Sequence, residues 1–126
     1  MKNNQLMIYG AYGYAGELMV REAVAQGLRP IIAGRDDEKL KPIATELSLE
    51  CRAFGVRNTG SNLQDISVLL NCAGPFSATA EPLARACLAQ QIHYLDITGE
   101  IDIFRKCHAL DEEARQQNVL ILPGAG

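Results

Sequence analysis

A glycine-rich turn from Gly10 to Gly16, directly after the apolar run Leu6 to Tyr9, constrains the fold of this chain more than any other feature. The glycines have the spacing G-x-x-G-x-x-G, and a helical pattern begins at Glu17. Glycines in such a strand–turn–helix unit allow positive φ angles and a close approach of backbone N–H groups to a ligand. A helix N-terminus in this setting binds the pyrophosphate of a dinucleotide. The first gap is one residue wider than in the usual G-x-G-x-x-G fingerprint, so the strand–turn–helix context carries the prediction.

The end of the second apolar run indicates which dinucleotide is bound. In an NAD site, an acidic residue at this strand end binds the ribose 2′-hydroxyl. Here the run Pro30 to Ala33 ends in Gly34 and Arg35, and a guanidinium offers a planar fork for a phosphate. Lys39, four residues on, adds a second positive charge. We therefore expect NADP(H); the alternative is that Arg35 is an ordinary solvated residue.

Length, charge and cysteine pattern limit the classes of protein that this chain can represent. Its 126 residues are 48% hydrophobic, which fits one domain with a real core, and the net charge of -3 argues against a nucleic-acid surface. No apolar run reaches the ~18 residues of a membrane span, and no signal peptide precedes the first strand, so we expect no membrane partner. The four cysteines show no C-x-x-C spacing, which favours reduced thiols and a cytoplasmic location.

Apolar runs and helical patterns alternate along the whole chain. Strands are expected near 6–9, 30–33, 51–56, 68–72, 93–97 and 119–122, and helices near 17–23, 38–47, 82–90 and 101–117, with one helical turn at 61–65. The run at 68–72 is continuously apolar, as in a strand covered on both faces. The alternation predicts an α/β fold, a doubly wound, Rossmann-type parallel sheet of about six strands with helices on both faces.

Single residues predict where the helices begin and end. Asp36 and Asp37 precede an apolar helical stripe, so we expect them to cap that helix rather than to bind a ribose. Pro42 lies inside the same stripe and should delay or bend the start of the helix. Asn118 should end the last helix as its C′ residue.

Ligands of such sheets lie beyond the carboxyl ends of the strands, next to the point where the strand order reverses. The fourth strand leads into the segment Asn71-Cys72-Ala73-Gly74-Pro75-Phe76, in which Asn71, Ala73, Gly74 and Pro75 stand out. Small residues and a rigid turn let a cofactor ribose lie close to the backbone, so these four residues are candidates for cofactor contacts.

Four motifs in the same order resemble the NADP-binding domain of the saccharopine dehydrogenase-like oxidoreductases. They are the Gly10–Gly16 turn, Ala33-Gly34-Arg35, the segment Asn71–Phe76 and the segment His93–Glu100, and the resemblance covers essentially the whole chain. It implies phosphate contacts at the turn, a 2′-phosphate contact at Arg35 and nicotinamide-side contacts after the fourth strand. The implied residues are Gly10, Tyr12, Gly13, Tyr14, Ala15 and Gly16 for the phosphates, and Ala73, Gly74 and Pro75 near the nicotinamide.

The resemblance also implies a larger protein. Members of that family continue into a second α/β domain, which dimerises and closes over the substrate. We therefore expect residues 1–126 to be the N-terminal, NADP-binding part of such a protein, with a homodimer in the full-length form.

Other dinucleotide, nucleotide and metal sites fit the sequence poorly. An extended short-chain dehydrogenase needs Tyr-x-x-x-Lys, and no tyrosine here has a lysine four residues later. A P-loop needs a lysine after its glycines. His93 and Asp96 lie three apart on a strand and face opposite sides, while His108 and Glu112 on one helix face supply only two ligands. We expect no metal.

Catalysis has the weakest signal. Asp96, at the end of the fifth strand, is the candidate for orienting a substrate amine or a cofactor carboxamide, and Glu100 is either functional or a first-turn helix acid. Two functions remain open. One is an oxidoreductase module that moves hydride between NADP(H) and a small-molecule substrate, inactive as this chain alone. The other is a non-catalytic dinucleotide-binding or sensing module.

Overall fold

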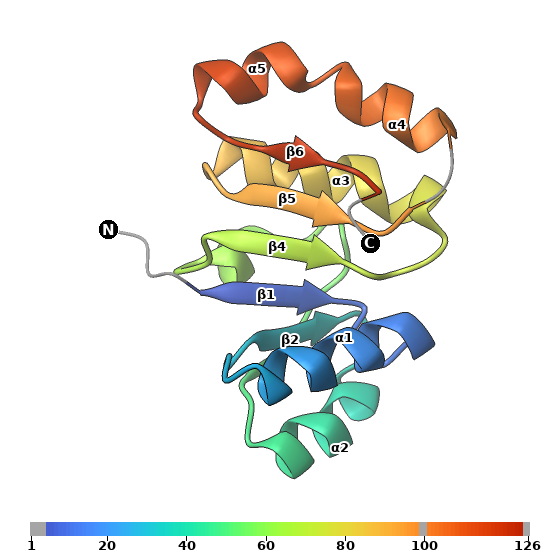
Figure 1. Cartoon of the computed structure of the whole chain (residues 1–126), viewed down its shortest axis with the longest axis vertical. Helices are drawn as coiled ribbons and strands as arrows, with labels where there is room; N and C mark the ends of the chain where they lie inside the picture. The colour runs from blue at the N-terminus through green and yellow to red at the C-terminus, as the bar shows by residue number, and fades with distance from the viewer. Residues whose placement is uncertain (1–4, 99–100, 125–126) are drawn as a thin grey trace.

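A computed structural model describes residues 5–98 and 101–124 of the chain. It contains a six-stranded sheet in the order β3-β2-β1-β4-β5-β6, and every neighbouring pair of strands is parallel (Figure 1). The strands are β1 (Leu6–Tyr9), β2 (Ile31–Gly34), β3 (Cys51–Ala53), β4 (Val68–Asn71), β5 (His93–Asp96) and β6 (Ile121–Leu122). The helices are α1 (Tyr14–Ala25), α2 (Asp37–Leu47), α3 (Phe76–Ala89), α4 (Ile101–His108) and α5 (Asp111–Gln116), with a 3₁₀ turn η1 (Gly60–Leu63). The predicted doubly wound fold is confirmed.

Helices cover both faces of the sheet. In Figure 1, α1 and α2 lie in front of the sheet, and α3 lies behind it. Along β1, Ile8 packs with the cluster that contains α1 and α2, while Met7 and Tyr9 pack with the cluster that contains α3. Both sides of β1 are therefore buried, which explains its continuous apolar run.

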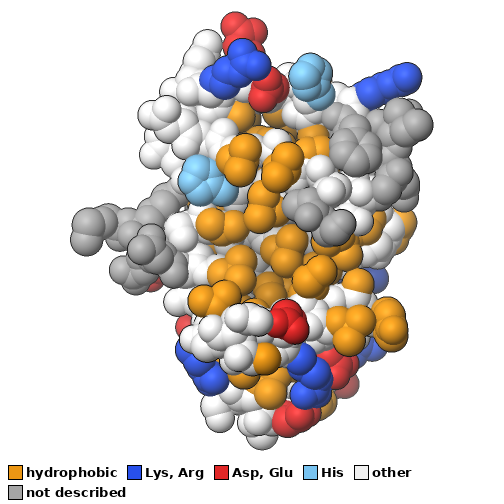
Figure 2. Space-filling model, viewed as in Figure 1, with side chains coloured by type: hydrophobic (Ala, Val, Ile, Leu, Met, Phe, Trp, Pro, Cys, Tyr) orange, Lys and Arg blue, Asp and Glu red, His pale blue; other side chains and the backbone are white. Residues whose placement is uncertain are grey.

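β4 and β5 are covered less evenly than their sequence predicts. Leu69 and Tyr94 point toward α3 and are fully buried, whereas Leu70 and Leu95 on the opposite side are only half-buried. Figure 2 shows hydrophobic side chains on this side, above the part of the sheet that α1 and α2 cover. The expectation that 68–72 is covered on both faces thus holds for one face only, since α1 and α2 lie over the other half of the sheet.

The structure corrects two predictions about where helices begin. α2 begins at Asp37 without delay, because Asp36 accepts a hydrogen bond from Glu38 N at 3.0 Å and caps the helix, with Pro42 in its interior. The cap role of Asp36 is thereby confirmed. α3 begins at Phe76, six residues before the predicted Pro82, because its buried face already includes Ala80. Burial of that face outweighs the one backbone hydrogen bond that an internal proline removes.

The predicted helix 101–117 is two helices. Leu110 N donates to Cys107 O at 3.0 Å, which ends α4 with a tighter turn. α5 then begins with three acids, from Asp111 to Glu113, and acids are favoured at a helix N-terminus. The predicted end at Asn118 is confirmed: its φ is 55°, and Val119 N donates to Ala114 O at 2.8 Å.

Candidate functional site

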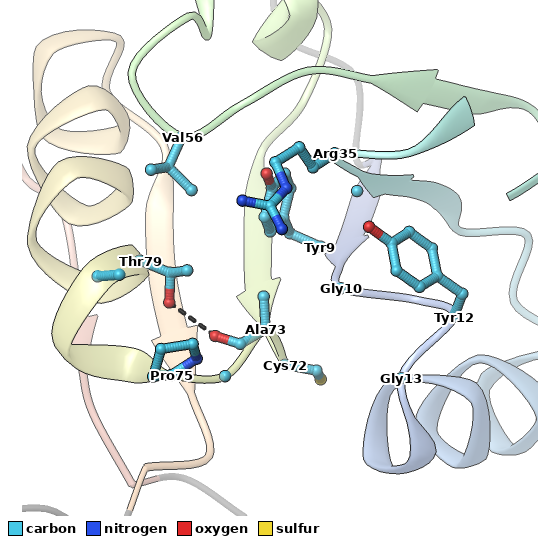
Figure 3. A pocket seen from close by; sticks show the side chains of 13 residues that line it. Tyr9, Gly10, Tyr12, Gly13, Arg35, Val56, Cys72, Ala73, Pro75 and Thr79 are labelled. Carbon is cyan, nitrogen blue, oxygen red and sulfur yellow. Dashed lines mark hydrogen bonds between the residues drawn. The ribbon is translucent and has the colours of Figure 1, made fainter. Parts of the chain in front are cut away.

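The carboxyl ends of β1, β2 and β4 surround a pocket with a cavity volume of ≈ 270 Å³ (Figure 3). It lies where the strand order reverses, because β1 pairs with β2 on one side and with β4 on the other. Its walls come from the turn after β1, the end of β2, the loop after β3, and the loop and first turn of α3 that follow β4. The lining residues are Tyr9, Gly10, Tyr12, Gly13, Gly34, Arg35, Val56, Cys72, Ala73, Gly74, Pro75, Ala78 and Thr79.

Gly10 is a glycine because two loops meet there. Its φ is +83°, and its N–H donates to Ala33 O at 2.8 Å, which turns the chain away from β1. A Cβ at Gly10 would lie 2.6 Å from the amide nitrogen of Ala73. The turn after β1 and the loop after β4 are therefore in direct contact, and no side chain fits between them.

The other two glycines of the turn differ from each other. A Cβ at Gly16 would overlap the carbonyl oxygen of Gly10, so this glycine serves the packing of α1 on the turn. Gly13 has an ordinary φ of −74°, and a Cβ there would meet only Gly10 O, at 3.5 Å. Gly74, across the pocket, has nothing within 4 Å of a Cβ position. The fold requires glycine at neither Gly13 nor Gly74, and both leave open space in the pocket.

The N-terminus of α1 faces this space without a side-chain cap. The first N–H groups of a helix have no intrahelical acceptor, and they carry the positive end of the helix dipole. Gly13 stands at the N-cap position with its backbone exposed. This end of α1 can therefore accept an anionic group from the pocket.

Arg35 brings a positive charge to the opposite wall. It is exposed at the end of β2, and Figure 3 shows its guanidinium beside Tyr9. Among the described residues, no hydrogen bond or ion pair engages Arg35, in contrast to Arg21, which pairs with Glu17 and Glu46. Burial raises the pKa of Tyr9 to about 12, with a further rise from Tyr12 and an opposing effect of the Arg35 charge. The guanidinium is thus available for an anionic ligand.

Tyr12 connects the glycine turn to the end of β2. Its hydroxyl accepts a hydrogen bond from Asp36 N at 3.2 Å. A Cβ at Gly34 would lie 2.5 Å from Tyr12 Cε2, so the ring rests on the backbone of β2. The Lys39 ammonium lies 5.6 Å from the centre of the same ring. Tyr12 therefore forms the wall between the turn and Arg35.

The structure brings together eight of the thirteen predicted cofactor residues in the pocket lining. They are Gly10, Tyr12, Gly13, Gly34, Arg35, Ala73, Gly74 and Pro75. The other five lie outside the lining: Tyr14 is 87% exposed, Ala15 and Gly16 belong to α1, Lys39 lies behind Tyr12, and Asn71 is buried below the pocket.

The sequence analysis does not identify Tyr9, Val56, Ala78 and Thr79 of the lining, and it includes Cys72 only as part of the segment 71–76. Tyr9 is the last residue of β1, and its place at a strand end was an available signal. Thr79 has no signal in the sequence, because the pattern predicts a helix only from Pro82, whereas α3 begins at Phe76. Burial and the Asp96 charge raise the pKa of the Cys72 thiol to about 11, so this cysteine is a neutral part of the wall.

Asp96, the predicted catalytic residue, is fully buried and does not line the pocket. Tyr94 donates its hydroxyl to Asp96 Oδ2 at 2.6 Å, and Asp96 Oδ1 accepts from Thr98 N at 3.0 Å and Gly124 N at 2.9 Å. Burial and the bond to Asp96 raise the pKa of Tyr94 far above its usual value. A catalytic role of Asp96 stays a prediction, and Glu100 lies outside the described residues.

Neither a metal site nor a membrane span is found in the described parts of the chain. No group of three or more histidine, cysteine, aspartate or glutamate side chains there could hold a metal ion. No helix there is both long and apolar enough to cross a bilayer.

Comparisons with known proteins show the family of this chain. The family model described as the saccharopine dehydrogenase NADP binding domain matches residues 6–122. The saccharopine dehydrogenase-like oxidoreductase of Rattus norvegicus is 26% identical over 145 residues, which covers 97% of this chain and 34% of that protein. A lipid droplet localized protein of Caenorhabditis elegans is 22% identical over 143 residues, covering 100% of this chain and 34% of that protein. The chain thus spans about a third of the length of these relatives.

Solved structures share the fold at low sequence identity. Saccharopine dehydrogenase (L-Glu forming) from Saccharomyces cerevisiae superposes with a TM-score of 0.81 at 12% identity, over 98% of this chain and 27% of that one. The yeast methylglyoxal/isovaleraldehyde reductase complexed with NADPH has a TM-score of 0.74 at 10% identity, over 94% of this chain and 52% of that one.

Proposed function

This chain belongs to the family of saccharopine dehydrogenase NADP-binding domains, and from that premise we propose that it is the cofactor-binding part of an oxidoreductase. The reaction is hydride transfer between NADP(H) and a small-molecule substrate. The observation that carries the proposal is the pair Gly13 and Gly74, two pocket glycines that the fold itself does not require. Their missing side chains leave room for a ligand that lies against the backbone on both walls.

Each wall has chemistry that suits one part of this cofactor. The uncapped N-terminus of α1 suits the pyrophosphate, because its amides and dipole favour negative charge. Arg35 suits the 2′-phosphate, since its guanidinium has no other partner among the described residues. Ala73 and Gly74 offer exposed backbone on the remaining wall, where the nicotinamide ribose can lie.

The pocket lining can hold and orient a cofactor, but its described residues offer no group for proton transfer at neutral pH. Among the described residues, its lining contains neither a carboxylate nor an imidazole. Tyr9, with a pKa of about 12, and Cys72, with a pKa of about 11, stay protonated at neutral pH. Bound NADP(H) supplies the hydride chemistry. We therefore infer that the groups that hold and protonate the substrate come from another part of a longer protein, and that this chain alone binds cofactor without turnover.

The test compares this chain with a longer protein that contains a downstream domain. Both are titrated with NADPH and NADH, and both are assayed with amino-acid, 2-oxo-acid and enoyl substrates. The proposal predicts NADPH binding by both proteins and turnover only by the longer one. NADPH binding without turnover by the longer protein would favour the dinucleotide-binding or sensing module. Turnover by the short chain would contradict the inference that the substrate-binding groups come from another part of a longer protein.

We also propose a cytoplasmic location and, for the longer protein, a homodimer. The first is supported by the described cysteines, which form no disulfide bond with one another, as in reducing compartments. The second rests on the family resemblance. Cell fractionation and sedimentation of the longer protein test them.

A further inference from the structure

Two polar side chains are buried side by side beneath the pocket. Asn71 ends β4, Asp96 ends β5, and the two residues are paired in the register of the sheet. Both are fully buried, on the side of the sheet that faces α3. The Tyr94 hydroxyl joins them: it accepts from Asn71 Nδ2 at 3.2 Å and donates to Asp96 Oδ2 at 2.6 Å.

At the Asn71 end, this hydrogen-bond network fixes the part of the pocket wall that contains Ala73. Asn71 Oδ1 accepts from Ala73 N at 2.9 Å, and Asn71 Nδ2 donates to Thr79 Oγ1 at 3.0 Å. The Thr79 hydroxyl in turn donates to Ala73 O at 2.7 Å, as Figure 3 shows. Both polar backbone groups of Ala73 are thus fixed by side chains, and Ala73 is the residue that meets Gly10 across the switch point.

The Asp96 end holds the segments that follow β5 and β6. Its Oδ1 accepts from the backbone N–H groups of Thr98 and Gly124. No ion pair to Asp96 is found among the described residues, so its charge is stabilised by two backbone N–H groups and the Tyr94 hydroxyl. Burial of a carboxylate is costly without such bonds, and buried polar networks of this kind fix one arrangement of the chain. No buried side-chain nitrogen or oxygen in the described residues lacks a partner.

We propose that Asn71, Tyr94 and Asp96 form a positioning relay that sets the Ala73–Gly74 backbone for the nicotinamide half of NADP(H). Asp96 then acts through Tyr94 and Asn71 rather than by contact with the substrate, in place of the catalytic role that its position suggests. The inference rests on the proposed function. The two halves of the cofactor then have separate supports. The relay contacts the wall after β4, whereas Arg35 follows β2 and Tyr12, from the turn after β1, packs against the end of β2.

The experiment removes the central hydroxyl by Tyr94→Phe and measures two ligands by calorimetry. NADPH reports on the whole site, and adenosine 2′,5′-bisphosphate reports on the adenosine half alone. We expect the Kd for NADPH to rise about fivefold to tenfold, as for loss of a buried hydrogen bond, and the Kd for adenosine 2′,5′-bisphosphate to change less than about twofold.

His93→Ala is the matched control. It removes a side-chain hydrogen bond from the same strand, where His93 Nδ1 accepts from Leu120 N at 2.9 Å, but at the end of β5 away from the pocket. We expect it to lower stability and to leave both affinities unchanged. A second pair of variants, Thr79→Val and Thr79→Ser, serves if Tyr94→Phe does not fold: valine should reproduce the selective loss of NADPH affinity, and serine should restore it.

The possible outcomes separate the relay from the proposed function. Wild-type protein that binds neither ligand would contradict the proposed function and the relay with it. Wild-type binding of both ligands, with a Tyr94→Phe variant that keeps full NADPH affinity, would overturn the relay alone. Equal losses for both ligands would also overturn it, because a merely structural role would weaken the two halves together.

Discussion

The carbonyl oxygen of Gly10 lies where a Cβ of Gly16 would stand, so the turn after β1 and the first turn of α1 pack without room for a side chain. Gly13, between them, is under no such constraint, since a Cβ there would make only an ordinary contact at 3.5 Å. One turn thus contains a glycine needed for packing and a glycine whose open space we propose for a ligand. The two roles can be separated by substitution.

Gly13→Val should abolish NADPH binding while the domain stays folded. The extended N-cap conformation at Gly13, φ −74° and ψ 167°, accepts a β-branched residue, but the side chain would fill the space proposed for the pyrophosphate. Gly16→Ala is the contrasting variant, and overpacking against Gly10 should destabilise the domain by about 1–3 kcal/mol. Circular dichroism, thermal melting and calorimetry measure these effects. A folded Gly13→Val protein with wild-type affinity would show that the phosphates bind elsewhere.

Asp36→Ala should lower the free energy of unfolding by about 1 kcal/mol, because it removes the N-cap of α2. Asp36→Ser should restore most of this stability, since a hydroxyl can also accept from Glu38 N. Neither variant should weaken NADH binding, because the carboxylate caps the helix rather than binding a ribose. Urea unfolding and NADH titration test both points. A fall in NADH affinity with unchanged stability would restore the ribose interpretation.

Alkaline pH should destabilise the domain through groups whose folded pKa is raised. Unfolded tyrosine deprotonates near pH 10, whereas Tyr9 in the fold keeps its proton until about pH 12. Its contribution is therefore complete below pH 10 and is lost as the pH rises toward 12, by about 2–3 kcal/mol in total. Burial raises the pKa of Cys72 and of Cys107 from the ordinary value of 9.0 to about 11, so both thiols act in the same direction between pH 9 and 11.

Urea unfolding from pH 8 to 11.5 checks this dependence. Tyr9→Phe is the control, because it keeps the ring but removes the hydroxyl that donates to Phe54 O at 2.7 Å. We expect a shallower fall in stability above pH 10 for this variant. A flat profile for the wild-type protein between pH 9 and 11.5 would contradict the assignment.

The sheet was predictable because its central strands have strong patterns. β1 is apolar on both faces and is followed at once by glycines, which leaves few alternatives to a strand–turn–helix unit. α3 was misplaced because Pro82 is a good first helical residue, and only the tertiary burial of Ala80 shows that the helix begins earlier. Local propensity does not include that burial.

The candidate site was predictable where backbone geometry decides it and not where side-chain direction does. Gly10, Gly13 and Arg35 line the pocket as predicted. Asn71 and Asp96 also stand at strand ends, but they point into the interior toward α3, where they bond to Tyr94. Position at a strand end does not reveal which face a side chain joins, and alternation is hard to read when both faces are apolar.

The central claim is that Arg35 recognises the 2′-phosphate of NADP(H) in this pocket, and calorimetric titration of the wild-type and Arg35→Ala proteins with NADPH and NADH tests it most directly. We predict that the wild-type protein binds NADPH more tightly than NADH. Arg35→Ala should weaken NADPH binding by about 1.5–3 kcal/mol, the range for a hydrogen bond to a charged group, with little change for NADH. Arg115→Ala, which removes the same charge from an exposed pair with Asp111, should change neither affinity. Equal wild-type affinities for the two cofactors, or an equal loss of both in Arg35→Ala, would contradict the claim.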